Sequence, residues 1–188
     1  MEWVQRSVMA STRRRELLTE ALDRLGPGHS ALRVRVCAAL LMELAMPGSG
    51  EDVRALAREV EDGAREVGDV ESLLSVVNAR HILLRTSPDP SARQAVGAEL
   101  RELAEAHADP WWQARSLVAD IYDAFIDGRH GEVVALADRL LDRADRARSA
   151  RLRWHHALVL ASLNRDLGDF AEADRWAEEA VMRGAAGG

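Results

Sequence analysis

The sequence contains no lysine and one cysteine, and apart from tryptophan it has few aromatic residues, namely two phenylalanines and one tyrosine. All 25 basic residues are therefore arginine. A P-loop nucleotide site needs a lysine after a glycine-rich turn, so this chain cannot form one. We expect neither ATP hydrolysis nor tight ATP binding, and calorimetry with ATP tests this. The lone Cys37 excludes an internal disulfide and is typical of a reducing, cytoplasmic setting.

Long apolar runs and a strong basic balance are also missing. No stretch approaches the roughly 20 apolar residues that span a bilayer, and the N-terminus lacks the order of charges and apolar residues seen in signal peptides. The net charge of the 188-residue chain is −6. Arg13-Arg14-Arg15 is followed by Glu16 and Glu20, so we interpret it as a solvated helix face. We expect a cytoplasmic chain that binds neither membranes nor nucleic acid directly.

Catalytic and metal-binding patterns are not apparent either. His155 and His156 are adjacent, so they point to different faces of a helix, and no cysteine or further histidine lies at ligand spacing. Cys37 has no histidine partner pattern, and the chain has no Gly-x-Ser-x-Gly elbow. The sequence therefore predicts no enzyme activity, no metal and no cofactor.

The most informative feature that is present is a repeat. Turn residues recur in steps of 40, at Gly48, Pro88, Gly128 and Gly168. Eight residues after each turn stand the apolar residues Leu56, Val96, Leu136 and Trp176, and the next positions hold Ala57, Gly97, Ala137 and Ala177. Good N-cap residues recur with the same step at Asp69, Asp109 and Ser149. A fixed period of this length indicates a solenoid of helical units.

The period predicts the domain organisation. We expect an all-α, right-handed solenoid of antiparallel helix pairs in a single domain, 1–188, with about nine helices and no strand. Its parts are a partial repeat, 1–28, and the pairs 29–68, 69–108, 109–148 and 149–188. The boundary near Ser149 carries no glycine or proline and is placed by the period alone.

The last pair is the clearest hairpin. We expect Phe170 to close the end of the pair, and Ala173, Ala177 and Ala180 to form a stripe where the partner helix approaches closely. The final helix also carries the apolar residues Trp176, Ala177 and Val181, and we expect some of this apolar surface to be left uncovered. We expect the helix to fray at Gly184. We therefore predict self-association through the terminal helices, or coverage by a further repeat.

Several segments carry a family likeness. They are Ser30-Ala31-Leu32-Arg33 with Leu40 to Leu44, Asn78-Ala79-Arg80-His81, Arg153-Trp154, Gly168-Asp169-Phe170-Ala171-Glu172-Ala173, and Ala177-Glu178-Glu179-Ala180. In these segments the chain resembles the tetratricopeptide-like region of large bacterial signal-transduction ATPases that end in a LuxR-type DNA-binding domain. The resemblance implies a sensory or protein-interaction arm of a multidomain transcriptional regulator. The alternative is a free-standing scaffold that binds a peptide segment of a partner protein.

The resemblance also implies a binding surface. In such stacks the first helix of each pair lines the concave side, which would bind a protein, a peptide or a small-molecule inducer. The predicted binding residues are Arg35, Asn78, Arg85, Arg115, Tyr122, Phe125, His155 and Arg165, with Met42, Ile82, Val118 and Leu158 beside them. Arginine suits carboxylate ligands, and we expect Arg85 and Arg115 to be the main anchors. The apolar members are also compatible with core positions between repeats.

Overall fold

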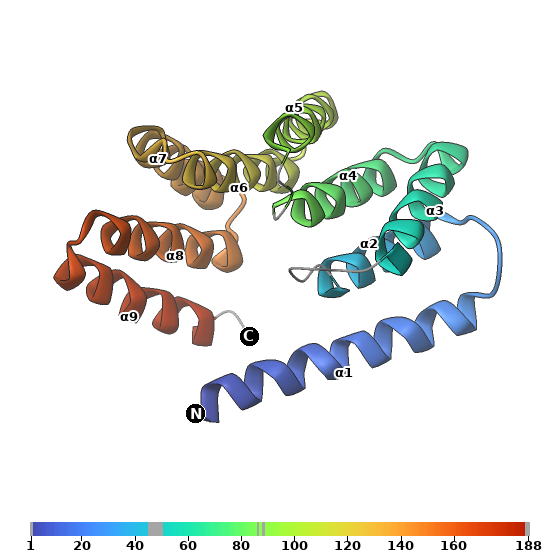
Figure 1. The fold of residues 1–188 in the computed structure, drawn as a ribbon, viewed down its shortest axis with the longest axis horizontal. Helices are drawn as coiled ribbons and strands as arrows, with labels where there is room; N and C mark the ends of the chain where they lie inside the picture. Colours follow the sequence, from blue (N-terminus) through green and yellow to red (C-terminus); the bar gives the residue numbers. More distant parts are fainter. Residues whose placement is uncertain (1, 45–50, 86, 88, 187–188) are drawn as a thin grey trace. The chain divides into compact units, whose positions relative to one another are not determined.

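The chain folds into α-helices joined by short turns. The computed structural model describes the backbone of residues 2–44, 51–85, 87 and 89–186, and the side chains of 12–44, 53, 55–85, 87 and 89–184. In these residues it has nine helices and no strand (Figure 1), which confirms the all-helical prediction. The helices are α1 (Glu2–Leu25), α2 (Ala31–Leu44), α3 (Glu51–Val67), α4 (Val70–Leu84), α5 (Pro90–His107), α6 (Pro110–Ile126), α7 (His130–Arg146), α8 (Ala150–Leu167) and α9 (Phe170–Ala186).

Two compact units divide the chain, and the first comprises residues 1–96. Within it α1 packs on α2, α2 packs on α3 and α4, and α3 packs on α4. The buried centre of this unit is formed by Val34, Cys37, Ala38, Leu41, Val60, Ala64, Val76 and Ala79. Each helix is thus stabilised chiefly by burying an apolar face against its neighbours in the chain.

The second unit comprises residues 97–188. Within it α6 packs on α7 and α8, α7 packs on α8, and α8 packs on α9. Its core consists of Ala114, Leu117, Val118, Ile121, Ala124, Val133, Ala137, Leu140, Ala144, Leu152, Val159 and Leu163. Helices that are neighbours in sequence are again neighbours in space, as a repeat fold requires.

Side-chain caps set where three of the helices begin. The Asp69 carboxylate accepts a hydrogen bond from the backbone N–H of Ser72 at 2.9 Å, and Asp109 accepts from Trp111 and Trp112 at 2.9 and 3.1 Å. The Ser149 hydroxyl accepts from the N–H of Leu152 at 3.3 Å. These oxygens satisfy amides that have no partner inside the helix. The weakest predicted boundary, at Ser149, is therefore a helix start.

Replacing Ser149 with alanine should cost about 1 kcal/mol of stability, because the first-turn amides of α8 lose their side-chain acceptor. Urea unfolding followed by circular dichroism measures this loss. Ser149→Asp serves as the control, because aspartate is an equally good cap and also favours the positive end of the helix. A Ser149→Ala chain as stable as wild type would contradict the assignment.

Glycines in the left-handed conformation end two of the hairpin helices. Gly128 has φ 70° after α6, and Gly168 caps α8 with φ 83°. Residues with a β-carbon seldom adopt this conformation, so glycine at these two predicted turns has a physical reason. The other two predicted turn residues, Gly48 and Pro88, lie outside the described residues, as does the predicted helix end at Met46.

Ion pairs join helices that follow one another across a hairpin boundary. In the first unit Glu61 on α3 pairs with Arg80 on α4 at 3.0 Å. In the second unit Arg101 on α5 pairs with Asp120 on α6 at 2.9 Å. Because 101 is 61 + 40 and 120 is 80 + 40, the two pairs occupy equivalent predicted positions with the charges exchanged. Opposite charge is thus kept at the contact although the sign of each partner changes.

Contacts within the last two hairpins repeat in the same way. The Arg143 guanidinium on α7 donates to the Gln113 side-chain carbonyl on α6 at 2.5 Å. Forty residues later, the Arg183 guanidinium on α9 donates to the Arg153 backbone carbonyl on α8 at 3.2 Å. An arginine in the second helix of each hairpin therefore reaches back to the first turn of the helix before it.

Three details of the last hairpin were predicted wrongly. The Phe170 side chain is 66% exposed, so it does not close the end of the pair. Ala173 and Ala180 are buried as predicted, but Ala177 is exposed, because the face of α9 toward α8 is centred nearer Trp176. The helix does not fray at Gly184 but continues to Ala186, and a β-carbon at Gly184 would meet the Trp154 ring at 3.3 Å.

Candidate partner-binding surfaces

Two of the predicted binding residues in the first unit lie where α2 packs on α4. Arg35 is half-buried, and its guanidinium pairs with the Glu71 carboxylate at 2.5 Å. Asn78 is buried, and its side-chain amide donates to the sulfur of Met42 at 3.2 Å. The structure therefore brings α2 and α4 together at these positions, with Arg35 toward the surface and Asn78 in the interior.

Arg85 stands directly after α4. Its backbone N–H donates to the carbonyl of Ile82 at 3.3 Å, which closes the last turn of the helix. The side chain is half-buried, as is that of Ile82. The Nε atom of the guanidinium is fully buried, so a ligand could contact only the rest of the side chain, and the anchoring role stays a prediction.

The α6 residues Arg115, Tyr122 and Phe125 lie on neighbouring turns of one helix. All three are half-buried, and Val118 between them is fully buried. Tyr122 and Phe125 pack against the core of the second unit, and Phe125 also contacts the ring of His130 edge to face. Both rings are used in part for packing, so a ligand at this helix would contact only the part of each ring that the core leaves exposed.

The two predicted residues on α8 differ in exposure. His155 is half-buried, its Nδ1 lies 3.2 Å from the Arg151 carbonyl, and its ring stands edge to face against Trp154. Arg165 is exposed and pairs with Asp166, the next residue in the chain, at 3.0 Å. An exposed pair between sequence neighbours adds little stability, so Arg165 can exchange this partner for another anion at low cost.

A groove between α1 and α2 was not predicted from the sequence. It has a volume of about 530 Å³ and is lined by Thr12, Arg15, Glu16, Thr19, Glu20, Asp23, Leu40 and Leu44. Two contacts hold α1 on α2 beside it: Arg14 pairs with Glu43 at 2.8 Å, and Arg33 donates to the Leu22 carbonyl at 3.1 Å. In the sequence, its mostly charged and polar lining has the pattern of an ordinary solvated helix face, so the sequence carries no signal of a groove.

His156 is a buried histidine of the second unit with a shifted pKa. It is buried, and its ring stands edge to face against Trp176 with centroids 5.7 Å apart. Burial lowers the pKa of His156, the positive charge of Arg183 lowers it further, and Asp138 and Asp145 oppose the shift. The neutral imidazole is therefore the form that this interior accommodates.

Stability should consequently fall as the pH drops below about 6.5, the ordinary histidine pKa. The unfolded chain binds a proton at His156 more readily than the folded chain does, so stability is fully present above that pH and is lost beneath it. We expect His156→Leu to flatten this part of the profile. Urea unfolding from pH 8 to 5.5 measures both proteins, and equal slopes would contradict the assignment.

Chemistry-bearing clusters are sparse in the part of the chain that the structure describes. Cys37 is a buried free cysteine, and its burial raises the pKa of the thiol, which disfavours the reactive thiolate. No group of three or more histidine, cysteine, aspartate or glutamate side chains could hold a metal among these residues. None of the described helices is long and apolar enough to cross a membrane.

Comparison with known proteins gives no relative. No protein-family model matches the chain, and no curated protein or solved structure is significantly similar to it. The functional argument therefore rests on the residues and contacts above.

Proposed function

We propose that this chain is a protein-interaction module, built as a right-handed solenoid of helix hairpins that repeat about every 40 residues. The observation that carries the proposal is the recurrence of equivalent contacts at this spacing. Asp69, Asp109 and Ser149 each cap a helix, and the Glu61–Arg80 and Arg101–Asp120 ion pairs occupy equivalent positions. Stacked hairpins of this kind expose extended helical faces, and such surfaces are used to hold other chains.

The role that we propose is a sensory or protein-interaction arm of a multidomain bacterial transcriptional regulator of the LuxR-type ATPase class. The support for this role is the sequence resemblance together with the all-helical, sequential packing. The first helices of the hairpins would bind a partner protein, a peptide or an inducer. A free-standing scaffold for a partner peptide is the alternative, and the reading frame around the gene separates the two: an adjoining ATPase or DNA-binding domain supports the arm.

Arg85 and Arg115 provide the test of the binding surface. Each is half-buried and lies on or directly after the first helix of a hairpin, so part of each side chain is accessible to a ligand. An array of acidic peptides should bind the wild-type chain and bind Arg85→Ala or Arg115→Ala on the order of tenfold more weakly, since a lost charged hydrogen bond is worth about that much.

The exposed Arg139 on α7 supplies the matched control, because Arg139→Ala removes the same charge from an outward face. Thermal melts of all variants accompany the binding curves. If the Arg85 and Arg115 variants bind like wild type but melt at lower temperature, these arginines are structural and the proposed binding surface is wrong. A selective loss of binding without a change in melting supports it.

A further inference from the structure

The second unit has an apolar face, formed by α8 and α9, that no other described helix of this unit covers. We call it the end face and define it by Trp154, Leu158 and Ala161 on α8 and Ala177 and Val181 on α9. The three α8 residues are half-buried, Ala177 is exposed, and Val181 is 71% exposed. Exposure of contiguous apolar side chains on two adjacent helices is uncommon on the free surface of a folded protein.

The preceding hairpin shows what covers such a face. On α7, Ala137 and Ala144 are fully buried in the same apolar cluster as Leu152 of α8, and α7 packs on α8. Forty residues later, the equivalent positions Ala177 and Gly184 on α9 are both exposed. Among the described helices of the second unit, α6 and α8 both pack on α7, whereas α8 alone packs on α9, which accounts for the burial of Ala137 and Ala144 and the exposure of their equivalents.

The first helices show the same contrast. Ala114, Val118 and Ile121 of α6 are all fully buried. The positions 40 residues later on α8 are Trp154, Leu158 and Ala161, and each of these is only half-buried. On both α8 and α9, the incompletely buried residues thus stand at positions whose equivalents on α6 and α7 are buried. Because a helix buries those positions in the preceding hairpin, we expect a helix to be the partner that fits here.

Charge indicates what kind of helix would fit. Glu172 and Glu179 on α9 are each paired with an arginine of the same helix, at 2.6 Å in both cases. Asp174 and Glu178 are exposed, and neither forms an ion pair with a side chain that the structure describes. They are one helical turn apart and lie next to the Phe170, Ala177 and Val181 side of α9, so the apolar face has an acidic border.

The covering helix of the preceding hairpin brings positive charge to such a border. Arg153 of α8 pairs with Asp145 of α7 at 2.7 Å. Arg80 of α4 likewise pairs with Glu61 of α3 in the first unit. Where the second helix of a hairpin presents an acid on this side, the helix that packs on it presents an arginine.

We propose that the end face binds an amphipathic helix of a partner protein that carries arginine or lysine along one edge of its apolar stripe. The small residue Ala177 lets the backbone of this helix approach α9 closely, whereas the Trp154 ring already lies against Gly184, and Val181 and Leu158 bury apolar area against the helix. Asp174 and Glu178 receive its basic residues. This site shares Leu158 with the predicted concave surface, but it does not depend on Arg85 or Arg115.

The probe for this site is a synthetic, fluorescein-labelled peptide that spans residues 149–167. It has the required chemistry, because it is the α8 helix that covers the equivalent face of α7 and it carries Arg151, Arg153 and Arg165. Fluorescence anisotropy with the full chain measures its affinity. Asp174→Lys/Glu178→Lys should weaken binding on the order of tenfold, and Ala177→Arg should weaken it at least as much, by blocking close approach.

The matched control is Glu59→Lys/Asp62→Lys, which makes the same change in net charge on exposed positions of α3. This variant should bind the peptide like wild type, and a peptide with its three arginines changed to glutamate should not bind. Sedimentation and thermal melts show whether each variant stays folded.

Three results would overturn the proposal. The first is no binding of the peptide at millimolar concentration, and the second is equal affinity for the wild type and the Asp174→Lys/Glu178→Lys variant. The third is concentration-dependent self-association that Ala177→Arg abolishes, because a second copy of the chain would then be the occupant of the end face. Failure of the Arg85 and Arg115 test, in contrast, leaves this site untouched.

Discussion

Ala137→Arg should strongly destabilise the chain, whereas Ala177→Arg, the same change 40 residues later, should leave its stability almost unchanged. Ala137 on α7 is fully buried in the core of the second unit, to which α8 also contributes. An arginine there would displace packed side chains, and its charge would be buried without a partner. Overpacking together with an unpaired buried charge costs about 3 kcal/mol or more. Ala177 is exposed on α9, and substitutions at such sites usually stay within about 0.5 kcal/mol.

The two variants are matched in residue, substitution and helix position, so their difference isolates the effect of the covering helix. Thermal unfolding followed at 222 nm measures both, and a chain of this length should lose about 6 °C or more with Ala137→Arg. Equal melting temperatures would show that α8 does not cover α7 in solution. A large loss with Ala177→Arg would show that α9 is covered too.

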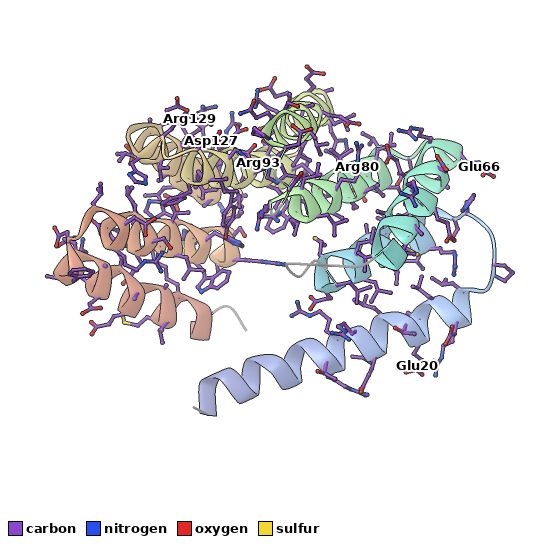
Figure 2. All side chains as sticks on the ribbon, in the orientation of Figure 1. Glu20, Glu66, Arg80, Arg93, Asp127 and Arg129 are labelled. Atoms are coloured by element: carbon purple, nitrogen blue, oxygen red, sulfur yellow. The ribbon has the colours of Figure 1, made fainter. Side chains whose placement is uncertain are left out.

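Arg93→Ala is expected to have a comparably large effect. Arg93 lies on α5 (Figure 2) and is only 2% exposed, although the positions 40 residues before and after it, Val53 and Val133, are apolar. A guanidinium is buried this completely only when its charge is met by interactions, and Arg93 does make them. Truncation leaves a void and removes those interactions, so we expect a loss of about 3 kcal/mol.

Urea unfolding of Arg93→Ala beside Arg139→Ala checks this expectation. Arg139 is exposed on α7, so its truncation should change stability by less than about 0.5 kcal/mol. If both arginines prove equally dispensable, the burial of Arg93 is not energetically important. If only Arg93→Ala lowers stability, the interactions of a buried charge stabilise α5 at a position where the neighbouring repeats have valine.

Much of the fold could be predicted because its signals are local. Asp109-Pro110 marks a helix start through a cap and a residue suited to the first turn, and Gly168 marks a helix end through its left-handed conformation. Ser149 carried no such neighbour, yet the period placed it at a cap. Caps and turns depend on a few adjacent residues, and the period depends on the order of residues along the chain, so the sequence alone contains the information for both.

The errors arise where the outcome depends on which helix covers which face. Phe170 and Ala177 are apolar residues of a kind that is usually buried, but α8 is the one described helix of the second unit that packs on α9, and it does not cover them, so both are exposed. Arg93 is of a residue type that is usually exposed, yet it is buried, because the packing of helices around it decides its exposure and this packing cannot be inferred from residue type. The groove between α1 and α2 depends on the angle and distance between two helices, which hydrophobic spacing does not encode.

Amide hydrogen exchange of the full chain, with and without a saturating amount of the 149–167 peptide, tests the central claim most directly. The claim is that this chain holds other proteins through helical faces that its own helices leave uncovered. We predict slower exchange confined to α8 and α9, absent in the Asp174→Lys/Glu178→Lys variant and unchanged in the Glu59→Lys/Asp62→Lys control. Unaltered exchange in α9, or protection that is equal in the first unit, would contradict the account.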